Sequence, residues 1–565
     1  MQETQQNGKK YLTGAELVIK ALIDENVDTI FGYPGGQVLA IYDALEAHRK
    51  QIKHILTAHE QGAAHAADGY ARATGKVGVV LATSGPGAAN LVTGIATACL
   101  DSSPIVAITG NVPTAQIGRD SFQELDIADI TMPITKHNYI VKDIKDLPRI
   151  LREAFDIARS GRQGPVLVDI PRDIQSAKIA ASDLADEERG RTRFRHLPVP
   201  SRSLYGIDDA VKLIKSAKRP VIYCGGGTVS SGAGELVMKL SEKIHAPVGC
   251  SLMGLSAIPT AFPANLGLTG MHGHDYATEA VRSADVIIAI GARFTDRATG
   301  SKGELVGSAK IIQFDIDPAE IDKNVTDAAY VIGDLRASLE TLLETLPDEP
   351  SSDEEWYSSA LERKMNACTT IIEDGGWLTP RGVIDEVNRA TGGTPVITDV
   401  GQHQMWAAQY CDITEERGFI TSGGLGTMGF GMGAAIGASI ALGKRPVVLY
   451  TGDGSFGMDL IELATAVSYN VPLIVVVMNN SSLGMVKQWQ KMLYRRTSQS
   501  ELHRETDFVK VAKAFGAKGM RAVNTSELKE ALNEAMGLVT KRKPTPFVID
   551  CVIDPDEKVV PTCLG

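Results

Sequence analysis

Residues 447–489 read VVLYTGDGSFGMDLIELATAVSYNVPLIVVVMNNSSLGMVKQW. This stretch predicts a strand, a tight turn, a helix, a second strand and a loop. The turn carries Asp453 between two glycines, and the loop carries Asn480 directly after the second buried strand. Open parallel sheets bind ligands at the carboxyl ends of their strands, and oxygen ligands suit a hard cation such as Mg²⁺. The stretch therefore predicts a site for a magnesium-bound diphosphate.

The predicted magnesium ligands are the Asp453 carboxylate, the Asn480 side-chain carbonyl and a backbone carbonyl near Ser482. Glycines on both sides of Asp453 would let the backbone approach a phosphate closely. A Gly-Asp-Gly turn is common, so by itself it is weak evidence for function. The paired asparagines after a buried strand, with 24 residues at 455–478 in between, make the functional interpretation much stronger.

Length and composition narrow the class of protein. A chain of 565 residues is too long for one core and predicts several domains. The net charge of −11 argues against a nucleic-acid coat and against binding to an anionic membrane surface. The seven cysteines are scattered without a C-x-x-C pair, which indicates a reducing compartment and no zinc or disulfide framework. The polar N-terminus and short apolar runs predict a cytoplasmic protein without a membrane span.

Strands alternate with helical patterns along most of the chain, which predicts an α/β protein built from doubly wound parallel sheets. Two polar breaks, at 175–206 and 347–356, interrupt the alternation. We expect three domains, at residues 10–180, 200–345 and 375–555.

Several other patterns lie where strands end. His59-Glu60-Gln61 heads a helix of small residues, and Thr83-Ser84-Gly85-Pro86-Gly87 follows a strand. Gly225-Gly226-Gly227, Gly291 and Asp315 each follow strands of the middle domain, where a dinucleotide could stretch across the sheet. Taken alone, Glu60 reads as a carboxylate that complements a helix dipole, and a triple glycine is weak evidence for a nucleotide.

Together these motifs resemble the thiamine-diphosphate enzymes. Gly-Asp-Gly followed at this spacing by Asn-Asn is similar to their cofactor motif, and the patterns at 59–61 and 83–87 resemble their pyrimidine-binding domain. The narrower resemblance, over residues 13–555, is to the acetohydroxyacid (acetolactate) synthase family in its biosynthetic, FAD-containing large-subunit form. The segments that carry it are 31–36, 121–124, 134–138, 291–294 and 484–489.

The resemblance implies a transferase that uses thiamine diphosphate, Mg²⁺ and FAD. It would decarboxylate pyruvate and join the hydroxyethyl carbanion to a second 2-oxo acid. Pyruvate would give 2-acetolactate and 2-oxobutyrate would give 2-aceto-2-hydroxybutyrate, early in valine, leucine and isoleucine synthesis. It also implies a homodimer or tetramer with active sites at the subunit interface, and allows a small regulatory subunit.

Glu60 would be the acid of this reaction. A carboxylic acid that is hydrogen-bonded to the aminopyrimidine ring favours the imino tautomer of the ring. The imino nitrogen then takes the thiazolium C2 proton. We expect Glu60 to be buried among alanines, because burial raises the pKa of a carboxyl group.

The resemblance also assigns residues to the substrates. Phe122 and Gln123 match family residues near the reacting carbon, and Arg172 stands where most relatives have a lysine. Met485 and Trp489 would line the substrate pocket, and Trp489 matches the residue that favours 2-oxobutyrate as second substrate. The alternative is an amphipathic helix that buries Met485, Val486 and Trp489 in the core.

The remaining assignments concern the two organic cofactors. Met428 would force thiamine to bend, and FAD would be structural because the ligation involves no net redox change. The thiamine diphosphate contacts would be Gly36, Pro86, Asn90, Val400, Gly401, Gln402, His403, Gly426, Met428, Gly452, Gly454, Ser455, Leu483 and Gly484. The FAD contacts would be Arg162, Gly225, Gly226, Gly227, Ser251, Leu252, Met271, His272, Gly291, Arg293, Arg297, Asp315, Ile316 and Asp334.

Three other functions remain open at this point. A pyruvate oxidase of the same architecture would pass electrons to the flavin, and a catabolic acetolactate synthase would lack FAD. A nucleotide-binding protein without activity would carry decayed motifs, against which the intact Glu60, Asp453 and Asn480 argue.

Overall fold

The computed structural model describes residues 5–6, 9–184, 206–300, 305–326, 328–350, 352–368, 378–504 and 506–559. The expected domain limits at 200 and 375, and most of the expected break at 175–206, lie outside these residues. By contacts the chain forms two compact units. The first unit comprises Met1–Leu197, Gly424–Arg445 and Met458–Leu473, and the second comprises Pro198–Gly423, Pro446–Gly457 and Ile474–Gly565.

The first sheet lies in the first unit and has six parallel strands in the order β4-β3-β5-β6-β8-β7. Its strands are β3 (Thr29–Gly32), β4 (Lys53–Leu56), β5 (Gly78–Ala82), β6 (Ile105–Asn111), β7 (His137–Ile140) and β8 (Val166–Pro171). Its helices are α1 (Gly14–Asp24), α2 (Leu39–Ala47), α3 (Glu60–Thr74), α4 (Pro86–Asn90), α5 (Val92–Leu100), α6 (Ile127–Thr131), α7 (Leu147–Arg159) and α8 (Arg172–Ser176).

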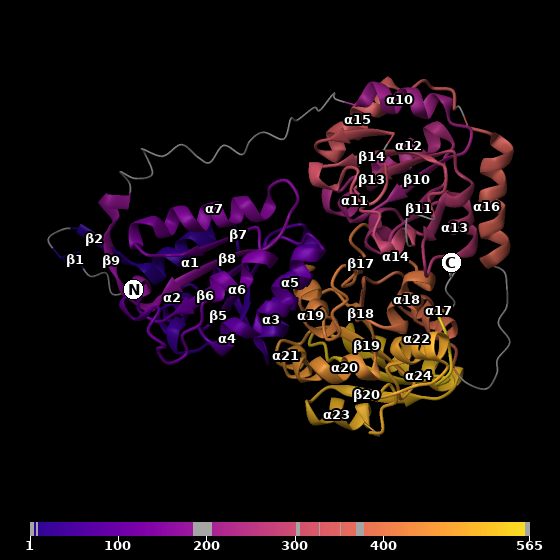
Figure 1. The fold of residues 1–565 in the computed structure, drawn as a ribbon. Coiled ribbons are helices and arrows are strands. Elements are labelled where there is room, and N and C mark those ends of the chain that lie inside the picture. The colour runs from indigo at the N-terminus through magenta and orange to yellow at the C-terminus, as the bar shows by residue number, and fades with distance from the viewer. Residues whose placement is uncertain are drawn as a thin grey trace. The chain divides into compact units, whose positions relative to one another are not determined.

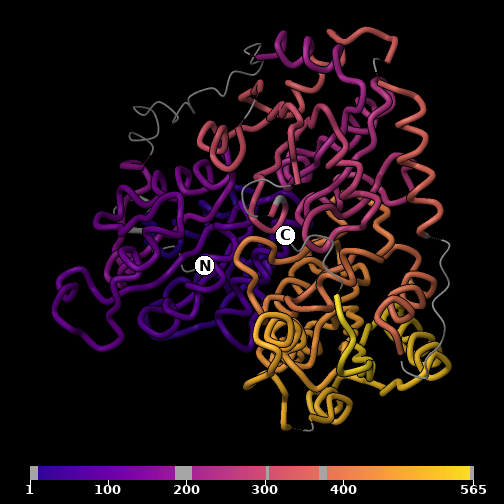
Figure 2. Tube along the Cα trace, turned by 45° about the vertical axis from the view of Figure 1, so that its right-hand side comes forward, coloured from indigo at the N-terminus to yellow at the C-terminus, as the bar shows by residue number. Residues whose placement is uncertain are grey.

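The middle sheet lies in the second unit and has the order β12-β11-β10-β13-β14-β15, again parallel. By position along the chain this is 3-2-1-4-5-6, the order typical of dinucleotide-binding sheets. Its strands are β10 (Pro220–Cys224), β11 (Val248–Cys250), β12 (Asn265–Leu268), β13 (Val286–Ile290), β14 (Lys310–Asp315) and β15 (Ala329–Ile332). Its helices are α10 (Ile207–Ser216), α11 (Gly226–Ser231), α12 (Gly234–Ile244), α13 (Asp275–Ser283), α14 (Asp296–Thr299), α15 (Leu335–Thr345) and α16 (Glu354–Cys368), and α16 runs beside α13 (Figures 1 and 2).

The third sheet has the order β17-β16-β18-β19-β21-β20. By position along the chain, this order and that of the first sheet are both 2-1-3-4-6-5. Its strands are β16 (Val396–Thr398), β17 (Phe419–Ile420), β18 (Val447–Gly452), β19 (Leu473–Asn479), β20 (Lys518–Ala522) and β21 (Phe547–Val552). Its helices are α17 (Pro380–Thr391), α18 (Gln402–Tyr410), α19 (Gly431–Ala441), α20 (Asp453–Asp459), α21 (Leu463–Ser468), α22 (Gly484–Tyr494), α23 (Phe508–Ala514) and α24 (Thr525–Val539).

These sheets confirm the expected class of three doubly wound parallel-sheet domains. Their central strands are apolar along their whole length, and β5, β13 and β18 are buried at every residue, as strands covered on both faces must be. Among the helices that the structure describes, none is both long and apolar enough to cross a membrane.

Helices α3 and α19 pack closely within the first unit (Figure 1). A Cβ added at Gly437 would lie 1.9 Å from the Ala66 carbonyl oxygen, and one at Gly69 would lie 2.2 Å from the Ala434 carbonyl oxygen. Real Cβ atoms do not approach so closely, so the absence of side chains at Gly69 and Gly437 sets the helix spacing. The small-residue pattern after Glu60 therefore belongs to a helix-helix contact.

Three local expectations need correction. No tight turn follows β18, because the strand ends at Gly452 and helix α20 begins at Asp453. Strand β7 was not expected, since its residues are only partly buried. A small antiparallel sheet also pairs β2 (Lys9–Thr13) with β9 (Lys178–Ala180), which ties the two ends of the first sheet's sequence together.

Candidate cofactor-binding and active site

The third sheet reverses its strand order between β16 and β18, and the two loops that diverge there carry most of the expected diphosphate contacts. Parallel α/β sheets bind ligands at such a point. Residues 399–403 follow β16, and residues 453–455 follow β18. The Ser455 hydroxyl donates a hydrogen bond of 2.8 Å to the Val400 carbonyl oxygen, which joins the two loops.

Asp453 is the most polar side chain at this point, and it is only 4% exposed. Its Oδ1 accepts a 2.8 Å bond from the Gly454 N–H, whereas Oδ2 is buried and has no hydrogen-bond partner among the described residues. Burial raises the pKa of Asp453 to about 6, against the opposing effect of backbone N–H groups of Gly454, Ser482 and Ser481. The carboxylate thus faces the 480–482 loop with one oxygen free, which suits a bound cation.

Asn480 belongs to an interlocked group of amides beside Asp453. Its Oδ1 accepts bonds from the Ser482 N–H at 3.2 Å and the Ser482 hydroxyl at 3.0 Å, and its Nδ2 donates to Gln402 Oε1 at 3.1 Å. A Cβ at Gly484 would lie 1.9 Å from that same Gln402 oxygen. Gly484 is therefore required for close packing, and the group fixes the direction of the Asn480 carbonyl.

His403 lies in the first turn of α18 and is buried, with its Nε2 unpartnered among the described residues. Burial lowers its pKa to about 3, so the imidazole is neutral at physiological pH. A Cβ at Gly452 would be 2.9 Å from His403 Nδ1, so the glycine makes room for the ring. A neutral N–H donor beside a helix N-terminus suits a phosphate oxygen.

Helix α22 bears only partly on the alternative in which its apolar face is buried: Met485 packs against the core, but Val486 and Trp489 are not buried in it. Its buried residues are Lys487 and Gln488, whereas Val486 is exposed and Trp489 is half-buried. The apolar side chains of this helix are therefore left partly uncovered, as expected of residues that line a pocket. Leu483 is the residue just before the helix.

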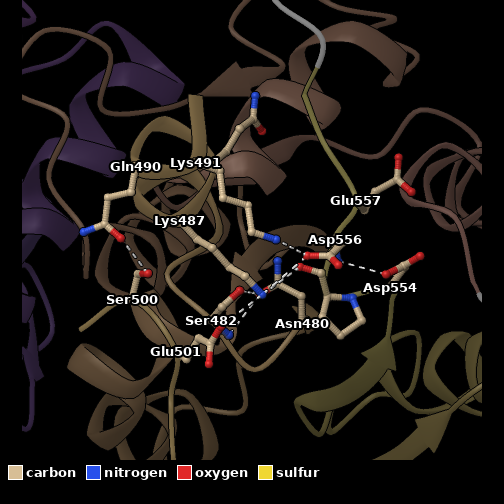
Figure 3. Close-up of polar contacts among 12 residues, drawn as sticks. Asn480, Ser482, Lys487, Gln490, Lys491, Ser500, Glu501, Asp554, Asp556 and Glu557 are labelled. Carbon is tan, nitrogen blue, oxygen red and sulfur yellow. Dashed lines mark hydrogen bonds and ion pairs between the residues drawn. The ribbon is translucent and has the colours of Figure 1, made fainter. Parts of the chain in front are cut away.

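The polar face of α22 is covered by residues 554–559, near the end of the described chain (Figure 3). Lys491 Nζ lies 2.6 Å from Asp556 Oδ1, and Lys487 Nζ lies 3.6 Å from the same oxygen. Gln488 bonds the Val559 backbone twice, donating to its carbonyl at 2.6 Å and accepting from its N–H at 3.0 Å. Gln402 also donates to the Glu557 carbonyl oxygen at 2.9 Å, so this segment is tied to the amide group around Asn480.

The first unit positions Glu60 at the first residue of α3. Its Oε2 accepts a 3.0 Å bond from Asn90 Nδ2, and its Oε1 would lie 3.2 Å from a Cβ at Gly87. Glu60 is half-buried and so less enclosed than expected, whereas most of the residues that follow it in α3 are buried. The helix and Asn90 nevertheless hold the carboxyl group in a defined position.

Four further residues expected to contact thiamine also lie in the first unit. Gly36 and Pro86 follow β3 and β5, the strands between which this sheet reverses its order. A Cβ at Gly36 would meet nothing within 4 Å, so there is open space beside it. Met428 is half-buried in the loop before α19, and a Cβ at the neighbouring Gly429 would lie 4.0 Å from Gln61 Nε2. The unit therefore brings the Met428 loop close to the start of α3, and Gly426 lies in the same loop.

The expected substrate residues of the first unit lie in exposed segments. Phe122 is 84% exposed, and Gln123 has a positive φ of 59° in the loop that follows β6. Arg172 is the exposed first residue of α8, after β8. Its neighbour Asp173 accepts a 3.0 Å bond from the Thr114 N–H, which ties α8 to the Phe122 loop.

The expected FAD residues of the second unit lie along one edge of the middle sheet, at the carboxyl ends of its strands. A Cβ at Gly225 would lie 2.1 Å from the Gly291 carbonyl oxygen, so these glycines let the loops after β10 and β13 touch at the point of strand reversal. Arg162 is the exception, since it lies in the first unit near the amino end of β8 and donates to the Ser102 hydroxyl. The edge residues are Gly225, Gly226, Gly227, Ser251, Leu252, Met271, His272, Gly291, Arg293, Arg297, Asp315, Ile316 and Asp334.

Two groups on this edge have the character of ligand contacts. His272 Nδ1 is buried without a partner among the described residues, and burial lowers the pKa of the ring to about 4. Burial raises the pKa of Asp315, at the end of β14, to about 6. Asp334 has a structural task as well, because it accepts a 3.0 Å bond from the Ala337 N–H and caps α15.

Sequence reasoning missed two features of the site. One is the segment 554–559 with its partner Gln488, for which a polar tail gives no signal. The other is Glu462, a charged residue in the apolar run LIELATAV that is only 1% exposed. A lone carboxylate among apolar residues is a signal that could have been noticed, since such a group is buried only when it has partners.

Comparison with known proteins agrees with this geometry. Three family models match the chain: the N-terminal binding domain of thiamine pyrophosphate (diphosphate) enzymes at residues 12–130, their central domain at 207–342 and their C-terminal binding domain at 399–551. The chain is 43% identical to the acetolactate synthase isozyme 3 large subunit of Escherichia coli K12, over 97% of this chain and 96% of that protein. The chain belongs to the acetolactate synthase family.

Similarity to this family extends across distant organisms. The chain is 44% identical to a probable acetolactate synthase large subunit of Methanocaldococcus jannaschii, over 97% of this chain and 93% of the relative. It is also 44% identical to an acetolactate synthase of Mycobacterium bovis, over 97% of this chain and 89% of the relative. The family relationship thus covers all three sheets and both units.

Proposed function

We propose that the chain is a biosynthetic acetolactate synthase, which condenses pyruvate with pyruvate or 2-oxobutyrate. The observation that carries the proposal is Asp453, a buried carboxylate with a free oxygen at the strand reversal of the third sheet, in a chain that matches acetolactate synthase large subunits over nearly its full length. Three domains, at about 10–180, 200–345 and 375–555, would hold the pyrimidine ring, FAD and the diphosphate.

Thiamine diphosphate and Mg²⁺ fit the residues of the third sheet. Asp453 Oδ2, the Asn480 carbonyl and the Ser482 backbone carbonyl are oxygen donors of the kind that Mg²⁺ prefers. His403 and the start of α18 would bind the phosphate oxygens. When bound, the cofactor supplies the electron sink that no side chain can offer during decarboxylation of a 2-oxo acid.

The chain's own residues would position the cofactor's ring and hold the proton that activates it. Glu60, held by Asn90, would hydrogen-bond the pyrimidine ring and hold the proton that favours the reactive tautomer. Met428, which approaches the start of α3, would support the bend of the cofactor. The open space at Gly36 would leave room for the ring.

The substrate residues would act by binding and orientation. Arg172 would bind the carboxylate of a 2-oxo acid, with a planar guanidinium in place of the ammonium of most relatives. Phe122, Gln123 and Met485 would exclude water around the reacting carbon. Trp489 would contact the extra methylene of 2-oxobutyrate and so set the preference for the second substrate.

FAD is proposed for the edge of the middle sheet, where the strand order, the touching glycine loops and the unpartnered His272 nitrogen fit a dinucleotide. Its role would be structural. We also propose a homodimer or tetramer with active sites at the subunit interface, which rests on the resemblance alone. A small regulatory subunit is proposed as well, supported by the large-subunit names of the relatives. A cytoplasmic location is supported by Cys224, Cys250, Cys411 and Cys551, which form no disulfide among the described residues.

The proposal is tested by incubating the protein with pyruvate, thiamine diphosphate, Mg²⁺ and FAD, with and without 2-oxobutyrate. We expect CO₂ release, 2-acetolactate alone in the first case and mainly 2-aceto-2-hydroxybutyrate in the second, with an unchanged flavin absorbance. Stoichiometric bleaching of the flavin by pyruvate would indicate an oxidase instead. Full activity in protein that binds no flavin would indicate a catabolic synthase, and absence of CO₂ release would contradict catalysis altogether.

A further inference from the structure

Two buried carboxylates outside the proposed cofactor contacts hold backbone groups within the first unit. Glu462 Oε1 accepts a 3.0 Å bond from the His59 N–H, and Oε2 accepts a 3.1 Å bond from the Ala58 N–H. Thr465 donates a third bond of 2.6 Å to Oε2. Glu462 therefore binds the backbone of the two residues that immediately precede Glu60.

Asp101 does the same for the loop that carries Met428. Its Oδ1 accepts a 2.6 Å bond from the Gly424 N–H, while its Oδ2 lies 3.0 Å from Arg72 Nη2. The Thr97 and Thr427 hydroxyl groups, 2.7 Å apart, add a second link between α5 and this loop.

The two contacts occupy corresponding places in the two sheets of order 2-1-3-4-6-5. Glu462 follows β18 and holds the residues after β4, whereas Asp101 follows β5 and holds the loop after β17. Each carboxylate thus comes after the third strand of one sheet and binds the segment after the second strand of the other. The relation is reciprocal, and it is centred on the α3–α19 contact.

We propose that Glu462 and Asp101 are positioning residues, which set where Glu60 and Met428 meet the thiamine ring. The proposal rests on the proposed function of these two residues. A carboxylate that accepts two consecutive backbone N–H groups fixes both the position and the direction of the chain at that point. Because α3 begins at Glu60, a shift of residues 58 and 59 would displace the acid itself.

The packing around Glu462 supports a specific position over general stabilisation of the helix. A Cβ at Gly62 would lie 2.1 Å from Glu462 Oε1, so the carboxylate lies directly against the first turn of α3. The alternative is that Glu462 only complements the helix dipole, an effect that would change stability without changing the reaction.

The test compares Glu462→Gln with Glu16→Gln in the fully loaded protein. Glu16 accepts a 2.7 Å bond from the Thr13 N–H at the start of α1, so it is a matched helix-capping glutamate in the same unit. The readouts are the rate of hydrogen-deuterium exchange at thiamine C2, kcat, KM for pyruvate, thiamine diphosphate affinity and thermal midpoint.

We expect Glu462→Gln to slow C2 exchange and kcat together by about 10- to 100-fold, since a small displacement of a reacting group has effects of this size. KM and cofactor affinity should stay within about twofold of wild type, because a misplaced acid leaves ground-state binding intact. Glu462→Asp keeps the charge but shortens the side chain by one methylene, so its C2 exchange and kcat should lie between those of wild type and Glu462→Gln. Glu16→Gln should lower only the thermal midpoint.

Equal C2 exchange in Glu462→Gln and wild type would overturn this inference and leave the proposed function standing. Absence of accelerated exchange in wild type would overturn both. If the Glu462 variants do not fold, Thr465→Val decides the question, because it keeps the carboxylate and removes one of its bonds. Slower C2 exchange in Thr465→Val than in wild type, by a factor that we expect not to exceed about five, supports the proposal. An unchanged rate overturns it.

Discussion

The first and third sheets share one strand order, yet their corresponding strand ends carry different chemistry. At the strand reversal of the first sheet the residues are small or apolar, such as Gly36 and Pro86. At the same point of the third sheet lie Asp453 and His403, a buried carboxylate and a neutral imidazole. Each arrangement suits one end of thiamine diphosphate, the uncharged ring in the first case and the metal-bound diphosphate in the second.

The correspondence extends to the neighbouring strands. Glu60 follows β4 and Met428 follows β17, the second strands of the two sheets. Phe122 follows β6 and Trp489 follows β19, the fourth strands. In the proposed reaction, equivalent positions would therefore serve the same part of the chemistry with different side chains. The scaffold would decide where a group lies, and the loop sequence would decide what it does.

Removal of Asp453 tests whether the third sheet binds the metal-bound diphosphate, and we expect the largest effect from it. Asp453→Ala should abolish magnesium-dependent binding of thiamine diphosphate, because the buried site would lose the carboxylate that we expect to bind the metal. Isothermal titration with the cofactor and Mg²⁺ measures this, with the exposed first residue of α13 as control in Asp275→Ala. Normal binding in the Asp453 variant would show that the diphosphate lies elsewhere.

A substitution of Glu60 tests whether the first sheet acts on the uncharged ring of the cofactor. Glu60→Gln should keep magnesium-dependent cofactor binding within a few fold and lower kcat by about 10²- to 10⁴-fold, the usual contribution of a positioned acid. Steady-state kinetics and the same titration separate the two effects. Loss of binding with little loss of turnover would reverse the roles that we assign to the two sheets.

A substitution of Trp489 tests the role proposed for the residue that follows the fourth strand of the third sheet. Trp489→Leu should lower the preference for 2-oxobutyrate over pyruvate by about 1–3 kcal/mol, the value of one methylene in an apolar pocket. Competition between the two substrates, with both products quantified, gives the ratio. Tyr494→Leu on the same helix is the control, since its side chain is exposed, and an unchanged ratio in both variants would exclude this role.

The α3–α19 contact provides the smallest predicted effect. Gly437→Ala should lower the free energy of unfolding by about 1–3 kcal/mol, because the new methyl group would overlap the Ala66 carbonyl. Gly537→Ala in α24 has open space around it and should raise this free energy by about 0.5–1 kcal/mol. Chemical denaturation of both variants measures the difference, and an equal effect would contradict close packing of the two helices.

Local sequence predicted the sheets well, because buried parallel strands are continuous apolar runs. The strand expected at residues 547–552 agrees with β21 at both ends, and the strands expected at 447–451 and 473–478 each end one residue before β18 and β19 do. The partial exposure of Glu60 was not predicted, since it depends on segments far away in the sequence. Gly484 shows the same limit: only its approach to Gln402, about 80 residues earlier, explains why it has no side chain.

Residues 424–445 and 458–473 belong to the first unit, although strands of the second unit flank them along the chain. Neither unit is therefore one continuous piece of polypeptide. A fragment that ends at residue 197 would expose the glycine face of α3 without α19 to cover it. Separate expression of the two halves should give insoluble material, and ribosomal synthesis must reach residue 473 before the first unit can complete its fold.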